Sequence, residues 1–158
     1  MSDVAVVGVG MHPFGKFEKS VADLGMHAAQ EALKDAGLTW RDVEAVAAAS
    51  SQFTGGFGWR LSGNELIQRM GETGIPVANV SAACAAGGHA FHNAVNMVAS
   101  GAVDICMAVG AEQMPKGFIA RPPGGSDDPS DVEYLRWATT GAPNTVYWAL
   151  EARRRMHE

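Results

Sequence analysis

Apolar and polar residues alternate along the chain in a pattern that predicts buried strands separated by amphipathic helices. Four short apolar runs bounded by glycine, proline or polar residues are typical of buried strands. These runs are Val4–Val9, Val43–Ala49, Pro76–Val80 and Val103–Val109. Between them lie three stretches with apolar residues at helical spacing, over residues 21–36, 62–70 and 84–100. This order predicts a parallel sheet with helices on both of its faces.

The predicted helices carry end signals. Ser20 is a good N-cap, and Asp23 three residues later completes a pair that resembles a capping box. Gly37 is placed to end this helix, and Gly71 and Gly101 follow the second and third helices in the same way.

The regular pattern ends near residue 115. From Pro115 to Pro143 prolines and glycines interrupt every candidate element, and Asn144 is then expected to cap a last helix that reaches the chain end. We therefore expect an α/β core over residues 1–114 and an excursion with a terminal helix over residues 115–158. Loops of this length inside compact domains are usually functional or belong to another layer of structure.

Composition and charge narrow the class of protein. The 158 residues are 47% hydrophobic and 18% charged, which indicates a globular chain. The net charge is −5, and the one basic cluster, Arg153–Arg155, closes a predicted helix, so nucleic acid is not an expected partner. No run of about 18 apolar residues predicts a membrane span. With two cysteines and no signal-peptide pattern, we expect a cytoplasmic protein.

The sequence supports neither a dinucleotide site nor a metal site. Gly8 and Gly10 follow the first predicted strand, but the third glycine of a dinucleotide fingerprint is missing and the next helix begins too far away. No His, Cys or carboxylate set has metal-ligand spacing, so we expect no metal. His12 and His27 have no partner that the sequence identifies.

The segment around Cys84 is the most informative. Small residues follow a predicted strand and lead into a helix, so Cys84 falls at or beside the helix N-terminus. Backbone N–H groups there favour a thiolate, the form that attacks acyl carbon. The alternative is that Cys84 is a small buried hydrophobic residue, which is what we expect of Cys106 within its strand. His89 and His92 have poor helical spacing for pairing with Cys84 and are expected to pack or to face solvent.

Two motifs resemble the thiolase superfamily. The first is the stretch Asn79–Ala90, with Cys84 in the nucleophile position, and the second is Gly101–Asp104 followed by Met107–Met114. Pro115–Phe118 is similar to the branch of sterol-carrier-protein or lipid-transfer thiolases, which are acetyl-CoA acetyltransferase-like. The resemblance implies a three-layer α/β/α fold, here an incomplete N-terminal half with a mostly parallel sheet.

The resemblance also implies the chemistry. Thiolases transfer acyl groups on coenzyme A thioesters, with coenzyme A as substrate and no permanently bound cofactor. Ala85 and Ala86 stand where the family usually has Ser or Gly beside the cysteine. Family members take their general-base histidine and a second catalytic cysteine from a C-terminal half, which is absent from these 158 residues. A fifth strand inside the family's sheet is also missing, so we expect this chain to be inactive alone.

Four functions remain open at this point. The first is thiolysis of 3-oxoacyl-CoA through Cys84, in lipid or steroid side-chain degradation. The second is a thiolase-like acyl-CoA retro-aldolase that works with an OB-fold partner. The third is a non-catalytic subunit in a homodimer or hetero-oligomer. The fourth is an unrelated doubly wound domain that binds a small ligand at the carboxyl ends of its strands.

Overall fold

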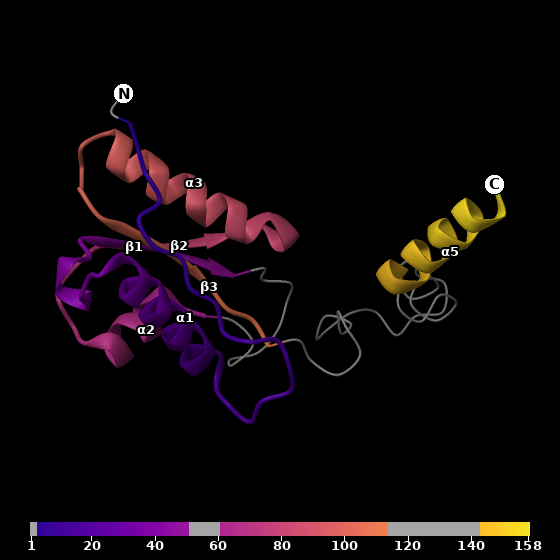
Figure 1. The fold of residues 1–158 in the computed structure, drawn as a ribbon, viewed down its shortest axis with the longest axis horizontal. Coiled ribbons are helices and arrows are strands. Elements are labelled where there is room, and N and C mark those ends of the chain that lie inside the picture. The colour runs from indigo at the N-terminus through magenta and orange to yellow at the C-terminus, as the bar shows by residue number, and fades with distance from the viewer. Residues whose placement is uncertain (1–2, 51–60, 114–142) are drawn as a thin grey trace, which may run out of the picture. The chain divides into compact units, whose positions relative to one another are not determined.

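The computed structural model describes residues 3–50, 61–113 and 143–158 (Figure 1). These residues fall into two units, one over 3–50 and 61–113 and one over 143–158. Expectations for the loop at residues 51–60 and the excursion at residues 115–142 lie outside the described residues.

A three-stranded parallel sheet forms the centre of the first unit. Its strands are β1 (Ala45–Ser50), β2 (Val77–Ser81) and β3 (Cys106–Gly110), in the order β2-β1-β3. On the central strand, Ala48 is paired with Asn79 on one side and Val109 on the other. The predicted parallel sheet is confirmed, although β3 begins three residues later than expected.

The middle strand faces two helical layers. Val46 and Ala48 of β1 lie in one apolar cluster with α1 (Val21–Ala36) and α2 (Gly63–Met70). Ala47 and Ala49 point the other way, into a cluster with α3 (Ala86–Ala99). Because successive strand residues face opposite sides, β1 is covered on both faces, and Figure 1 shows α3 across the sheet from α1 and α2. The expected α/β/α layering is confirmed.

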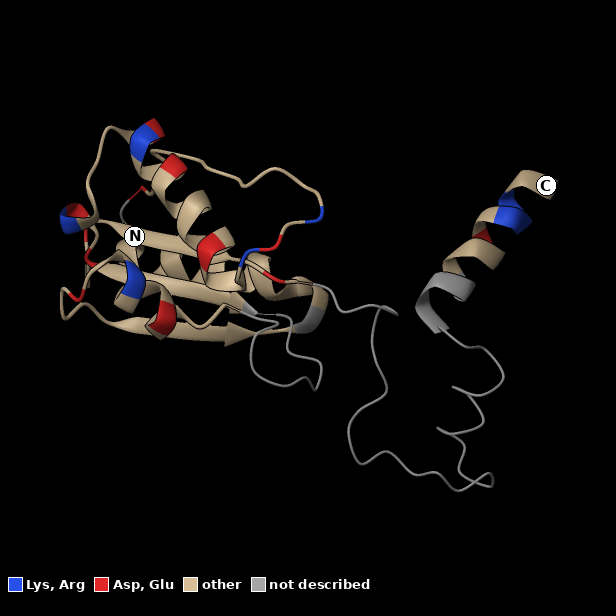
Figure 2. Cartoon of the chain, turned by 90° about the horizontal axis from the view of Figure 1, so that it is seen from below, with Lys and Arg blue, Asp and Glu red and all other residues tan. Residues whose placement is uncertain are grey.

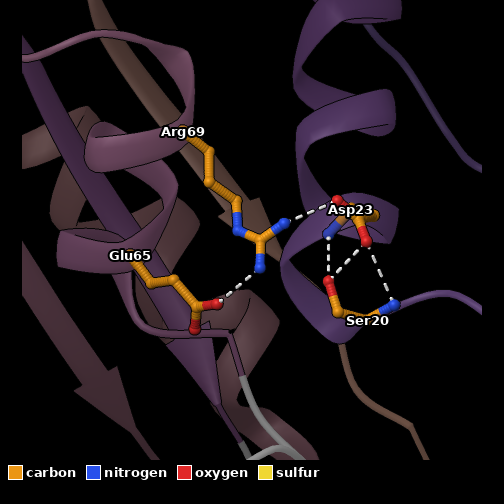
Figure 3. A network of polar contacts seen from close by, with 4 residues as sticks. All are labelled: Ser20, Asp23, Glu65 and Arg69. Atoms are coloured by element: carbon orange, nitrogen blue, oxygen red, sulfur yellow. Dashed lines mark hydrogen bonds and ion pairs between the residues drawn. The ribbon is translucent and has the colours of Figure 1, made fainter.

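Capping residues fix α1 as the sequence predicted. Asp23 N donates to Ser20 Oγ at 3.1 Å, and Ser20 N donates back to Asp23 Oδ2 at 3.2 Å, which completes the capping box. Gly37 has φ 67°, the left-handed conformation that glycine adopts without a steric cost, and ends the helix. Figure 3 shows the box together with Arg69 of α2, which contacts Asp23.

Alanines set the position of α3. Ala86, Ala90 and Ala94 recur every fourth residue and are 4%, 1% and 7% exposed, so one helix face lies against β1 with little side-chain bulk between them. The helix starts two residues later than predicted because a 3₁₀ turn, η2 (Ala83–Ala85), precedes it. A second short 3₁₀ helix, η1 (Trp40–Asp42), precedes β1.

The predicted buried strand at Val4–Val9 is wrong. No strand forms there, and Val6, Val7 and Val9 are 63%, 62% and 69% exposed. Val9 N donates instead to Asp35 Oδ2 of α1 at 2.9 Å. A Cβ at Gly8 would collide with the carbonyl oxygen of Ala32, so this segment lies directly against the α1 backbone. It lacks a neighbouring strand among the described residues, and its valines therefore stay outside the core.

The second unit contains one described element, α5 (Pro143–His157). Asn144 lies inside this helix instead of capping it, since Pro143 already takes the first helical position, which suits its missing N–H. The predicted basic end is present, and Arg154 Nε donates to Glu158 Oε1 at 3.0 Å.

Charged residues avoid the sheet. Figure 2 shows the strands free of Lys, Arg, Asp and Glu, which lie on helices and connecting segments. Among the helices that the structure describes, none is both long and apolar enough to cross a membrane.

Candidate functional site

Cys84 lies where β2 passes into α3. The strand ends at Ser81, Ala85 N donates to Ala82 O at 2.9 Å to close the turn, and the helix begins at Ala86. Cys84 is exposed in the middle of this turn. The predicted location, beside the N-terminus of the helix and at the carboxyl end of a strand, is confirmed.

The start of α3 leaves its backbone donors available to an anion. Its N-cap is Ala85, which has no side-chain oxygen to accept from them. No acidic residue occupies the first turn. The first N–H groups of the 14-residue helix and its dipole therefore favour negative charge at this end, which directly follows the turn that contains Cys84.

Two glycines leave the first turn of α3 without side chains on its exposed side. A Cβ built on Gly87 or Gly88 would meet no heavy atom within 4 Å. Both residues are exposed, in contrast to Ala86, which faces the sheet. The first turn of α3 is therefore open on the side away from β1, as the run of small residues predicted.

The histidines of α3 do not form a pair with Cys84. His89 and His92 are both exposed, as expected. The hydrogen bonds between described residues include none that joins either imidazole to the Cys84 sulfur.

Cys106 has the opposite environment. It is the first residue of β3, partly buried, and its thiol lies 3.8 Å from the Met97 sulfur. Burial raises the pKa of the Cys106 thiol, while a backbone hydrogen bond from Ala47 lowers it by less. Since a protonated thiol is a poor nucleophile, Cys106 acts as a packing residue, in agreement with its predicted role.

Asn79 has a structural role that sequence reasoning missed. Its Oδ1 accepts from Gly63 N at 2.8 Å, and its Nδ2 donates to Asn64 Oδ1 at 2.8 Å. These bonds fasten β2, the strand that leads to Cys84, to the start of α2. A Cβ on Gly63 would lie 2.5 Å from Val77 Cγ1, so glycine permits this close contact. A polar residue inside an otherwise apolar strand was the available signal.

His12 and His27, for which the sequence identified no partner, lie together. Their ring centroids are 4.8 Å apart. Within residues 3–50, 61–113 and 143–158, no group of three or more His, Cys, Asp or Glu side chains is arranged to hold a metal ion.

Comparisons with known proteins point to one family. The sequence matches the profile "Thiolase, N-terminal domain" over residues 4–124. It is 35% identical over 160 residues to acetyl-CoA acetyltransferase of Methanothermobacter thermautotrophicus, covering 100% of this chain and 40% of that protein. It is 32% identical over 157 residues to benzoylsuccinyl-CoA thiolase subunit BbsB of Thauera aromatica, covering 98% and 38%. The chain thus spans about two fifths of the length of these curated relatives.

Two further similarities fit the same fold. Sterol carrier protein 2 of Gallus gallus is 39% identical over 121 residues, covering 74% of this chain and 21% of that protein. Among solved structures, the Ltp2–ChsH2(DUF35) aldolase superposes with a TM-score of 0.59 at 20% identity, covering 97% of this chain and 37% of that chain. The structural match bears on the fold alone.

Proposed function

Because this chain belongs to the thiolase family, we propose that Cys84 is the nucleophile with which the complete enzyme transfers acyl groups from coenzyme A thioesters. The observation that carries the proposal is the position of Cys84, exposed in the turn that opens α3. Coenzyme A enters as a substrate, and no resident cofactor takes part.

The proposed reaction is thiolysis of a 3-oxoacyl-CoA. The Cys84 thiolate attacks the 3-oxo carbon, and N–H groups at the start of α3 stabilise the oxyanion that forms. The bond between carbons 2 and 3 then breaks, which leaves the acyl group on sulfur, while carbon 2 of the departing acetyl-CoA takes up a proton. The thiol of a second coenzyme A finally attacks the acyl-cysteine and restores the Cys84 thiolate. The base for these proton transfers comes from outside the 158 residues.

Trapping the intermediate tests this proposal. The complete enzyme, incubated with a 3-oxoacyl-CoA in the absence of free coenzyme A and quenched in acid, is expected to carry the acyl mass on the peptide that contains Cys84. A Cys84→Ala variant should carry none. Acylation of another residue, or of none in an active enzyme, would contradict the assignment.

We further propose that this sheet is completed by polypeptide beyond the 158 residues, from the same protein or from a second subunit. Among described residues β3 pairs with β1 alone, so its other edge has no strand partner in that part of the chain. The segment 3–10 forms no strand among the described residues and exposes Val6, Val7 and Val9. Size-exclusion chromatography of the isolated chain is expected to show self-association or aggregation, whereas a well-folded monomer would contradict the proposal.

A retro-aldolase is the second candidate. The similar solved structure is named as an aldolase with a ChsH2 (DUF35) component, and BbsB is named as a thiolase subunit, so either chemistry fits an assembly of unlike chains. The two are separated by Cys84→Ala in the complete enzyme. Thiolysis requires the sulfur and should be abolished, whereas retained carbon–carbon cleavage favours the aldolase.

A further inference from the structure

The loop of residues 11–19, which joins the N-terminal segment to α1, is organised around one imidazole. We refer to it as the His12 loop. The His12 ring lies edge-on to Phe17, with centroids 4.6 Å apart, and edge-on to His27 of α1 at 4.8 Å. His12 Nδ1 lies 2.8 Å from Pro13 O, and Lys19 Nζ lies 3.3 Å from His12 Nε2.

These contacts specify one protonation state. A carbonyl oxygen only accepts, so the contact with Pro13 requires a proton on Nδ1. An ammonium only donates, so the contact with Lys19 requires a lone pair on Nε2. Both contacts are satisfied together only by the neutral ring protonated at Nδ1.

Two ionisable side chains contact this ring, Lys19 of the loop and His27 of α1. Lys16 and Glu18 are the other charged residues of the His12 loop, and Asp23 lies in the first turn of α1. The Asp23 carboxylate is directed at Ser20 and Arg69, as Figure 3 shows, so its hydrogen bonds are not made to His12. In the segment after β3, Glu112 is charged, and the neutral side chain of Gln113 reaches the His12 loop.

Gln113 ties the His12 loop to the end of the sheet. Its Nε2 donates to the carbonyl oxygens of Phe17 and Lys19, both at 3.5 Å. These bonds are long and therefore weak. The His12–His27 contact joins the loop to α1, and the Gln113 bonds join it to the segment after β3.

We propose that the His12 loop is a pH-sensitive strap, fastened while His12 is neutral and released when His12 takes up a proton. Protonation removes the lone pair that accepts from Lys19 and places a second cation 3.3 Å from its ammonium, beside His27. Since Gln113 follows β3 as the Cys84 turn follows β2, release occurs at the carboxyl edge of the parallel sheet, the edge that bears Cys84. The inference is independent of the acyl-transfer proposal.

Amide hydrogen exchange tests the strap in the 158-residue chain. A protection factor, the intrinsic exchange rate divided by the observed rate, is measured for the peptide covering residues 12–20 and for a peptide from β1. The first factor is divided by the second, so that any effect of global unfolding on both peptides cancels. We expect this ratio to fall about fivefold from pH 8 to pH 5, the effect of one lost hydrogen bond. His12→Gln, whose amide oxygen accepts from Lys19 without titrating, should hold the ratio constant. An unchanged ratio in the wild type, or the same fall in His12→Gln, would overturn the inference.

Discussion

Arg69, in the last turn of α2, donates from Nη1 to Oδ1 of Asp23, in the first turn of α1, at a distance of 2.7 Å (Figure 3). The same guanidinium contacts Glu65 through Nη2 at 3.1 Å, while the other Asp23 oxygen accepts from Ser20 Oγ at 2.6 Å. One carboxylate therefore completes the cap of α1 and links the two helices on this face of the sheet.

Asp23 is expected to stabilise the fold at neutral pH and to lose this effect in acid. Its hydrogen bonds with the side chain and backbone of Ser20, and then the charges of Arg69 and Lys19, hold the pKa of Asp23 below its usual 3.8. A carboxyl with a lowered folded-state pKa stabilises the fold above its unfolded value, and this contribution is lost as the pH falls through the folded pKa. In urea unfolding, wild type should exceed Asp23→Asn in stability at pH 7, and the difference should shrink below pH 3.8. An equal difference at both pH values would contradict the linkage.

Replacing the N-cap serine isolates the contribution of its side chain. Ser20→Ala removes the acceptor for Asp23 N and should cost about 1 kcal/mol of unfolding free energy. Ser62→Ala is the matched control, since Ser62 occupies the N-cap of α2 without a side-chain capping bond. Equal losses in the two variants would mean that the hydrogen bond of Ser20 is not the cause.

Glycine substitutions distinguish close contact from open space. A Cβ at Gly10 would collide with the carbonyl oxygen of Ala28, so Gly10→Ala should lower stability by about 1–3 kcal/mol. Gly88→Ala places its Cβ in open space within a helix and should raise stability by about 0.5–1 kcal/mol. Thermal unfolding of both variants checks the opposite signs. A neutral Gly10→Ala would show that the N-terminal segment does not lie against α1.

The alanine face of α3 should tolerate little added volume. Ala90 is 1% exposed against β1, so Ala90→Leu is expected to cost about 1–3 kcal/mol and to move α3, and with it the turn that holds Cys84. Phe91→Leu is the control on the same helix, where the side chain is 51% exposed. Urea midpoints of the two variants report the difference, and similar midpoints would argue against the close helix–sheet contact.

The sequence predicted the helix ends and the turn at Cys84, because residues close together in the chain determine both. Ser20, Asp23 and Gly37 identified the ends of α1 because capping is decided by residues a few positions apart. The turn at Cys84 was predicted because its small residues lie between a predicted strand and a predicted helix. Val4–Val9 has the composition of a buried strand, but burial requires a neighbouring strand, and its own sequence cannot reveal whether one is present.

The sequence did not predict the polar contacts between residues that lie far apart in the chain. The contact of His12 with His27 and that of Asn79 with Gly63 join residues fifteen or sixteen positions apart. Neither spacing follows a helical or strand repeat, so only the folded chain brings these groups together.

Alkylation of the two cysteines by iodoacetamide at pH 7, followed by intact mass and peptide mapping, tests the activated nucleophile most directly. Cys84 is exposed beside the N-terminus of α3, whereas Cys106 is partly buried with a raised thiol pKa. We expect Cys84 to be modified faster than a model cysteine thiol and Cys106 to be modified more slowly. A Cys84 that reacts no faster than the model thiol would contradict the claim that this turn activates its sulfur.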